Sequence, residues 1–343
     1  MNKILLTGAS GFIGSHIAEY FSSKGEQLKC LVRENSDISF LKTLNVEIIY
    51  GDICDKGSIE RAIANCNTVI HTAGIAKDWG SKESFTNNNV SATLNVIETS
   101  KKCGIEKIII TGSISSYGEE NCAIKKNEES PFKSHYPYFM DFVFPCKMNN
   151  YRDSKAILTQ KAIEFSKKEN TNLIIIEPTW VFGEREFNTG FYEYLKAVKE
   201  GSSFFPGSYK NKFHVIYAAD LARAYYYAFK KDIKGCERII VGTPEAEYQH
   251  IIYKMFCEKA ELKKPKNIAK TVIYPVAFIM ELFATVFNTK NPPLLTRGRV
   301  NMFYDNIEYD VSKAKTILGF ETEFGLEEAI KKTVNWYKLN GYL

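Results

Sequence analysis

Short apolar runs that alternate with longer amphipathic stretches are the feature that most constrains the fold of this chain. In the first half, runs of four to six residues rich in Ile, Val and Leu read KILLT, LKCLVR, VEIIY, TVIH, KIIIT and NLIIIE. Helical patterns cover residues 12–24, 84–103 and 151–168. Strands that are apolar on both faces indicate a parallel sheet covered by helices on both sides. The sequence therefore predicts an α/β fold with a doubly wound parallel sheet.

The alternation breaks after residue 177, which predicts a second, smaller domain. Residues 184–212 are rich in Gly and aromatic residues, and residues 262–310 are irregular. Open α/β sheets bind ligands beyond the carboxyl ends of their strands, so we expect the later segments to gather there. The predicted division is a sheet domain of residues 1–176 and 213–243, and a smaller C-terminal domain of residues 177–212 and 244–343.

The composition is that of an ordinary globular protein and excludes several classes. The 343 residues include 25% charged residues, and the net charge of +5 comes from scattered lysines, which predicts no nucleic-acid partner. The eight cysteines lie twelve or more residues apart, so they form no metal-type pair and indicate free thiols in a reducing compartment. An apolar strand pattern begins at Lys3. We therefore expect a cytoplasmic protein without a metal site.

A glycine-rich turn joins the first predicted strand to the first predicted helix. In TGASGFIG, glycines permit a tight turn and a close approach of the backbone to a pyrophosphate, and the helix N-terminus offers free N–H groups. This setting is specific, because the turn lies between a strand and a helix. It predicts a dinucleotide site that includes Gly8, Ser10, Gly11, Phe12, Ile13 and Gly14.

The end of the second strand bears on the choice of cofactor. Arg33 stands where an acid would bind the ribose of NAD, and an Arg there accommodates the extra phosphate of NADP. Ser36 is a further donor, whereas Glu34 could take the ribose role if the strand ends one residue later. We therefore favour NADP(H), with NAD(H) as the alternative.

The ends of the third and fourth strands complete the predicted cofactor site. Asp52 and Ile53 of GDICD lie beside the expected adenine, and Ala73 and Gly74 of HTAG are small enough for the cofactor to pass. His71 reads as a packed strand residue rather than a catalytic one.

Tyr151 and Lys155 of YRDSK lie four residues apart, so they share one face of a helix. A neighbouring ammonium favours the phenolate form of a phenol. The phenol could then exchange a proton with an alcohol or carbonyl during hydride transfer. ITGSISSYG ends the fifth strand and brings hydroxyl groups to the same edge.

These motifs together resemble the extended short-chain dehydrogenase/reductases of the NAD-dependent epimerase/dehydratase superfamily. TGASGFIG, GDI, HTAG, NVSATLNV, SISSYG, YRDSK, PTWVFG and AADLARA occur in the family's order over nearly the full length. The resemblance implies an enzyme in which Ser113 is the catalytic serine, Tyr151 is the acid/base, and Lys155 binds the nicotinamide ribose. It also implies a homodimer formed through residues 84–103 and 151–168.

Two further parts of the resemblance concern the cofactor site and an asparagine. The PTWVFG motif adds Pro178 and Val181 to the implied cofactor site. Asn89 matches a family asparagine near the active site, or it braces a helix.

Departures from the family pattern indicate which branch of the family the chain is similar to. Ile114 and Ser115 replace the Asp-Glu pair of 4,6-dehydratases. Trp180 and Phe213 stand where members that bind nucleotide sugars usually carry Asn and Arg. The chain is thereby similar to the 3β-hydroxysteroid dehydrogenase and dihydroflavonol reductase branch, with a substrate pocket of Trp180, Tyr117 and Phe213. Glu177 departs from a frequent Arg.

The resemblance implies interconversion of a secondary alcohol and a ketone on a small, apolar, ring-bearing substrate. A nucleotide-sugar epimerase with tightly bound NAD is the first alternative, and Lys210 and Lys212 could serve it by holding a phosphate. A non-catalytic NADP-sensing protein is the second alternative. The intact Ser113, Tyr151 and Lys155 argue against it, since a sensor needs none of them.

Two apolar segments remain outside this scheme. The insert 118–150 ends in an aromatic stretch, which predicts a lid over the cleft or a loop that contacts a partner. Residues 272–287 are apolar and flanked by lysines. They predict either a packed helix or a shallow membrane contact that would make the protein peripheral to a membrane.

Overall fold

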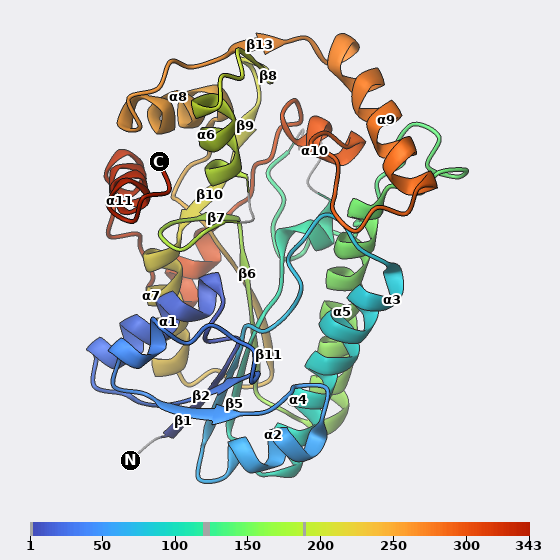
Figure 1. The fold of residues 1–343 in the computed structure, drawn as a ribbon. Coiled ribbons are helices and arrows are strands. Elements are labelled where there is room, and N and C mark those ends of the chain that lie inside the picture. The colour runs from blue at the N-terminus through green and yellow to red at the C-terminus, as the bar shows by residue number, and fades with distance from the viewer. Residues whose placement is uncertain (1–2, 119–123, 188–189) are drawn as a thin grey trace.

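The computed structural model describes residues 3–118, 124–187 and 190–343, and within them a seven-stranded parallel sheet is the central feature (Figure 1). All six predicted runs form strands of this sheet, in the spatial order β11-β6-β5-β4-β1-β2-β3. The bounds are β1 (Lys3–Thr7), β2 (Gln27–Val32), β3 (Glu47–Tyr50), β4 (Thr68–His71), β5 (Lys107–Thr111), β6 (Leu173–Pro178) and β11 (Cys236–Val241).

Helices cover both faces of the sheet, as the doubly wound prediction requires (Figure 1). Neighbouring residues of one strand point to opposite faces. Leu6 accordingly packs with α1 and α7, whereas Leu5 packs with α2, α4 and α5. The five helices are α1 (Phe12–Ser23), α2 (Lys56–Ile63), α4 (Ala92–Lys102), α5 (Lys147–Glu169) and α7 (Ala218–Lys230).

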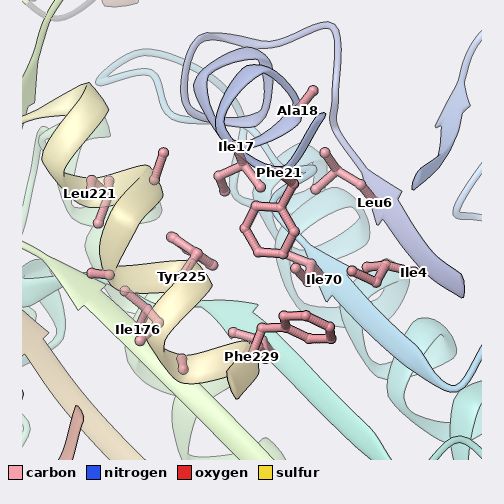
Figure 2. Packing of buried hydrophobic residues seen from close by; sticks show 14 of the residues in the cluster. Ile4, Leu6, Ile17, Ala18, Phe21, Ile70, Ile176, Leu221, Tyr225 and Phe229 are labelled. Carbon is pink, nitrogen blue, oxygen red and sulfur yellow. The ribbon is translucent and has the colours of Figure 1, made fainter. Parts of the chain in front are cut away.

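The core between α1, α7 and the sheet is close-packed and largely aliphatic (Figure 2). Phe21 of α1 is fully buried, and its ring centroid lies 5.6 Å from that of Phe229 in α7. Tyr225, also in α7, points toward the sheet and is fully buried. This packing holds α1, and with it the glycine turn, against the strand ends.

Two predicted helices differ from their expected bounds. The stretch 84–103 is divided into α3 (Lys82–Phe85), a π-helical segment Thr86–Ser91 and α4. Helix α5 begins at Lys147, four residues before the predicted start at 151. Its first turn is held by the buried side chains of Met148 and Asn149, which contact the preceding loop.

The later segments gather beyond the carboxyl end of β6 as a smaller unit around a largely aromatic core (Figure 1). Its helices are α6 (Phe191–Lys199), α8 (Gln249–Lys259), α9 (Lys270–Val286), α10 (Arg297–Met302) and α11 (Leu326–Leu339). Short strands that pair two by two lie in and beside it, namely β7 (Trp180–Phe182), β8 (Phe204–Pro206), β9 (Lys212–Phe213), β10 (Val215–Tyr217), β12 (Glu247–Tyr248) and β13 (Lys266–Ile268). Among the helices of the described residues, none is both long and apolar enough to cross a membrane.

The burial of Phe21 leads to a stability prediction. Phe21→Ala should lower the free energy of unfolding by about 3–5 kcal/mol, because it removes a large buried side chain and leaves a cavity. Phe142→Ala is the matched control, because Phe142 is 99% exposed. Urea unfolding followed by circular dichroism measures both. Equal midpoints for the two variants would contradict the packing described here.

Candidate active site

The register of the parallel sheet brings several strand ends to one edge. Thr7 at the end of β1 is paired with His71 at the end of β4, and Thr111 at the end of β5 is paired with Ile176 in β6. The residues that follow these strands therefore meet at the same carboxyl edge. The glycine turn, HTAG and the Ser113 segment all begin there.

The glycine turn has the shape that a pyrophosphate site needs. The Gly11 N–H donates to the Gly8 carbonyl at 2.9 Å, and Gly8 has a positive φ of +77°. A Cβ at Gly8 would collide with the backbone of Ala73, and one at Gly14 would collide with the Gly8 carbonyl. Helix α1 begins at Phe12 without a side-chain cap among the described residues, so its first N–H groups are left to bind an anion.

The remaining predicted residues of the turn surround this N-terminus. Ser10 and Gly11 are exposed, whereas Phe12 and Ile13 are half-buried. The residues present thus fit a bound dinucleotide.

A cleft of about 640 Å³ lies beside the ends of β2 and β3. It contains the predicted residues Arg33, Ser36 and Asp52, and also Glu34. Ile53 lies half-buried next to it and packs on the core beneath. Arg61 of α2 lines the same cleft and donates to the Ser58 hydroxyl at 3.1 Å. Sequence reasoning missed Arg61, although its position three residues after Ser58 on a helix was a usable signal.

The HTAG segment is held by a buried amide. Asn89, in the π-helical segment, accepts from the Ile75 N–H at 2.7 Å and donates to the Ile75 carbonyl at 3.0 Å and the Ser154 hydroxyl at 3.1 Å. A Cβ at Gly74 would lie 3.1 Å from the Asn89 Oδ1. Of the two interpretations of Asn89, bracing is therefore the one its contacts support.

His71 has the packed, structural environment that the sequence predicted. Its Nδ1 lies 2.6 Å from the Thr7 hydroxyl oxygen, and its Nε2 lies 2.9 Å from that of Thr93. Burial lowers the pKa of His71 to about 3, so the ring stays neutral.

Ser113, Tyr151 and Lys155 come together at the end of β5. The hydroxyl oxygens of Ser113 and Tyr151 lie 3.5 Å apart. The Lys155 ammonium donates to the Thr111 carbonyl at 3.1 Å. This arrangement offers two hydroxyl groups to one substrate oxygen and a cation behind them, which suits proton exchange with an alcohol or ketone.

Two neighbours that sequence reasoning missed fix this group. The Thr111 hydroxyl oxygen lies 2.6 Å from that of Tyr225 in α7, so the core anchors the strand end that Lys155 contacts. The ring of Phe85 lies edge-on to Tyr151, with centroids 6.1 Å apart. Burial lowers the pKa of Lys155 to about 8.

Two of the three residues predicted for the substrate pocket lie in the core instead. Tyr117 is fully buried, stacks on Phe132 and donates to the Glu177 carboxyl, while burial raises the pKa of both groups. Phe213 is buried between neighbouring aromatic rings. Neither side chain offers surface to a ligand, which corrects the prediction.

The third predicted pocket residue differs from these two. Trp180 remains half-buried, with its ring centroid 5.3 Å from that of Phe213. Pro178 is buried at the end of β6, and Val181 is half-buried in β7. Within the described residues, no group of three or more His, Cys, Asp or Glu side chains is arranged to hold a metal ion.

Comparison with known proteins gives a family match over most of the chain. The profile of the NAD dependent epimerase/dehydratase family matches residues 4–242. A 2-alkyl-3-oxoalkanoate reductase of Shewanella oneidensis is 23% identical, over 97% of this chain and 85% of the relative. The decarboxylating sterol-4-alpha-carboxylate 3-dehydrogenase of Saccharomyces cerevisiae is 25% identical, over 98% of each chain.

Solved structures show the same fold. The crystal structure of gox2253 matches with a TM-score of 0.82 and 24% identity over 100% of both chains. A UDP-glucose 4-epimerase of Thermotoga maritima, solved with UDP-glucose, matches with a TM-score of 0.77 and 20% identity, over 98% of this chain and 99% of that one.

The burial of Lys155 predicts a pH-dependent cost to stability. Its pKa is about 8 in the folded protein and 10.5 ordinarily, so the folded state must hold a disfavoured charge below pH 8. Lys155→Met should therefore raise the free energy of unfolding by roughly 3 kcal/mol at neutral pH. The wild-type protein recovers this deficit as pH rises from about 8 to 10.5.

Denaturant unfolding of the cofactor-free protein at several pH values measures this difference. Lys161→Met is the control, because Lys161 is exposed on the same helix. The prediction fails if Lys155→Met is less stable than wild type at neutral pH, or if its advantage persists above pH 10.5.

Proposed function

The chain belongs to the NAD-dependent epimerase/dehydratase family, and on that premise we propose that it interconverts a secondary alcohol and a ketone on an apolar, ring-bearing substrate. As a member of this family it is an NAD(P)-dependent enzyme of the extended short-chain dehydrogenase/reductase type, an oxidoreductase or epimerase. Of these two kinds of enzyme, we propose a reductase or dehydrogenase with a steroid-like or flavonoid-like substrate.

The observation that carries the proposed chemistry is the meeting of Ser113, Tyr151 and Lys155 at the end of β5. In the direction of reduction, Tyr151 gives its proton to the substrate oxygen and Ser113 holds that oxygen by a hydrogen bond. Lys155 stabilises the resulting phenolate and binds the ribose beside the nicotinamide. A bound nicotinamide cofactor supplies or accepts the hydride. In the direction of oxidation the proton returns to Tyr151.

The proposed substrate class rests on what surrounds the site. Trp180 presents a half-buried indole, which has one N–H and a large apolar face. The Lys212 ammonium lies 3.0 Å from the Glu308 carboxylate, so its charge is already balanced. A diphosphate would need several donors and unbalanced positive charge, whereas an apolar ring would pack on the indole.

The names of two relatives support the proposed alcohol–ketone chemistry, and one of them also supports a ring-bearing substrate. One reduces 2-alkyl-3-oxoalkanoates, and the other is a dehydrogenase of sterol-4-alpha-carboxylates. The nucleotide-sugar epimerase with tightly bound NAD remains the alternative, favoured by the likeness to a UDP-glucose 4-epimerase. The NADP-sensing alternative is disfavoured because the three reactive side chains are together.

We further propose a division of labour between the two parts of the chain. Residues 1–176 and 213–243 would bind the dinucleotide, and residues 177–212 and 244–343 would bind the substrate. The cleft and the glycine turn lie in the first part, and Trp180 lies in the second. Residues 84–103 and 151–168 are the proposed homodimer face, which sedimentation equilibrium can test.

Two arginines in one cleft support a preference for NADP(H). Arg33→Ala should raise the KM for NADP(H) at least about tenfold and barely change that for NAD(H), because only a charge-assisted phosphate contact is lost. Arg61→Ala should act in the same direction. Steady-state kinetics with both cofactors measure these changes. A wild-type enzyme that is faster and tighter with NAD(H) would reject the preference and make Glu34 the residue to test.

A ligand panel tests the proposed function directly. Hydroxysteroids, flavanonols, aromatic ketones and 2-alkyl-3-oxoalkanoates are compared with UDP-, GDP- and dTDP-sugars by thermal shift and by cofactor absorbance. We expect an apolar ring compound to stabilise the protein and to be turned over. Stabilisation by a nucleotide sugar alone would favour the epimerase, and turnover of only the alkyl compound would keep the chemistry and change the substrate class.

A further inference from the structure

Two apolar segments that are far apart in the sequence lie together on the surface of the molecule. One is the outer stripe of α9, and the other is the loop of residues 139–143. The centroids of the Phe139 and Phe278 rings lie 5.3 Å apart, which joins the loop to the helix. In Figure 1 the green loop extends beside α9 at the edge of the molecule.

The outer stripe of α9 is apolar along its whole length. Its residues recur at intervals of four and three, which keeps them on one helical face. They are Val272, Val276, Ile279, Phe283 and Val286, each between 45% and 65% exposed. On the inner face, Ile273, Ala277 and Ala284 are buried. The inner side of α9 is thus packed on the protein, whereas the apolar outer stripe is left uncovered.

The loop presents the most exposed aromatic side chain among the described residues. Phe142 is 99% exposed, and Phe139, Met140 and Val143 are also exposed. Side chains of this type seldom face water together on one surface. The loop and the outer stripe of α9 together form what we call the apolar face.

The apolar face is firmly supported from beneath. The Arg297 guanidinium donates to both oxygens of Glu281 in α9 at 3.0 Å. It also donates to the carbonyls of Phe139 and Phe144 at 2.5 and 2.6 Å. Arg297 and Glu281 are each about 2% exposed, so a buried ion pair clamps the loop to the helix. Removing either Arg297 or Glu281 would leave the other as an unpaired buried charge. The loop and α9 are therefore held together as one fixed surface.

The charges around the apolar face identify what covers it. Lys290 stands exposed at one end of the stripe. Lys270 stands at the other end, where its ammonium lies 3.7 Å from the buried Asp305 carboxylate. Lys147 follows the loop, with its ammonium 4.0 Å from the centroid of the Trp79 ring. The acid between Lys270 and Lys290, Glu281, is buried against Arg297. Asp141 of the loop is turned inward, since its carboxylate lies 3.0 Å from the His135 Nε2 and accepts from the Cys146 N–H at 2.7 Å. The exposed charge at the edge of the face is therefore the Lys290 ammonium, and the exposed stripe itself carries no charge. This pattern fits a bilayer with anionic headgroups, because apolar side chains enter the acyl region while the lysine at the edge meets the phosphates.

We propose that the apolar face is a docking surface for an anionic lipid bilayer, on which the protein lies without crossing it. The loop leads within a few residues into α5, which carries Tyr151 in its second turn. The Asn150 amide donates to the Gly80 carbonyl at 3.0 Å, and the Trp79 indole N–H donates to the carbonyl of Thr289, just after α9, at 3.1 Å, so the segment around Trp79 joins the end of α9 to the start of α5. Together with the proposed function, docking would deliver a lipophilic substrate from the bilayer to Tyr151.

Vesicle flotation of the full chain tests the docking surface without any substrate. Wild-type protein should float with vesicles of equal parts phosphatidylcholine and phosphatidylglycerol. The double variant Phe142→Ser/Phe283→Ser should bind the vesicles at least about tenfold more weakly, because the two aromatic side chains that would enter the bilayer are gone. Leu339→Ser is the matched control, because Leu339 is 86% exposed on α11 at a distance from the apolar face. Its binding should equal that of wild type.

The electrostatic part of the proposal has its own test. Lys290→Gln should weaken binding to these vesicles about fivefold and leave binding to pure phosphatidylcholine unchanged. NADPH affinity and circular dichroism of all variants should match wild type, which excludes misfolding. Wild-type protein that does not float, or a double variant that floats equally well, would overturn the proposal.

Three outcomes distinguish membrane docking from a dimer interface and from the proposed function. If the double variant converts a dimer into a monomer in the absence of vesicles, the apolar face is an interface between copies of the chain and the docking proposal is wrong. Vesicle binding requires no turnover, so a failed substrate panel would reject the proposed function alone. Conversely, turnover of a water-soluble ketone with no vesicle binding would reject docking alone.

Discussion

The alignment of the carboxyl ends of β1, β4, β5 and β6 is the constraint on which the site depends. Parallel strands in register end at one edge, so the segments that follow them meet although they are far apart in the sequence. The glycine turn, the Ala73–Gly74 segment and Ser113 all follow strands that end there. A shift in the register of β5 would move Ser113 away from Tyr151, because α5 is held in place by its own packing.

The buried Lys155 ammonium at this edge of the sheet lowers the stability of the fold and serves the proposed function. It is buried against one backbone carbonyl, that of Thr111, and the side chain of Thr111 is held by Tyr225 in the opposite helix layer. The core on one face of the sheet therefore positions a cation that enters from the other face. A buried charge of this kind is unfavourable for stability and useful beside a phenol.

The sequence predicted the parts that depend on local periodicity. Six strands, the start of α1 and the common face of Tyr151 and Lys155 follow from apolar patterns and helical spacing, and the structure contains them. The predicted start of α5 was late because Met148 and Asn149 owe their helical conformation to a tertiary contact with the preceding loop. Local propensity contains no such contact.

The errors around the predicted pocket have a similar origin. Tyr117 and Phe213 are buried because a turn after β5 and a two-residue strand pack into the aromatic core, and nothing in their own neighbourhood encodes that packing. Arg61 enters the cleft beside the ends of β2 and β3 from a helix whose orientation depends on the sheet. The Arg297 clamp joins segments more than 150 residues apart in the sequence. Rules based on residue spacing within one helix or strand do not predict contacts over such a separation.

Single-turnover kinetics of Tyr151→Phe test the central claim most directly. A preformed complex with NADPH is mixed with a ketone that wild type reduces, and the loss of cofactor absorbance is followed. The account predicts unchanged NADPH affinity and a reduction rate lower by about 10²–10⁴-fold, because the positioned proton donor is gone while the cofactor site is intact. A Tyr151→Phe protein that reduces the ketone at nearly the wild-type rate would contradict it.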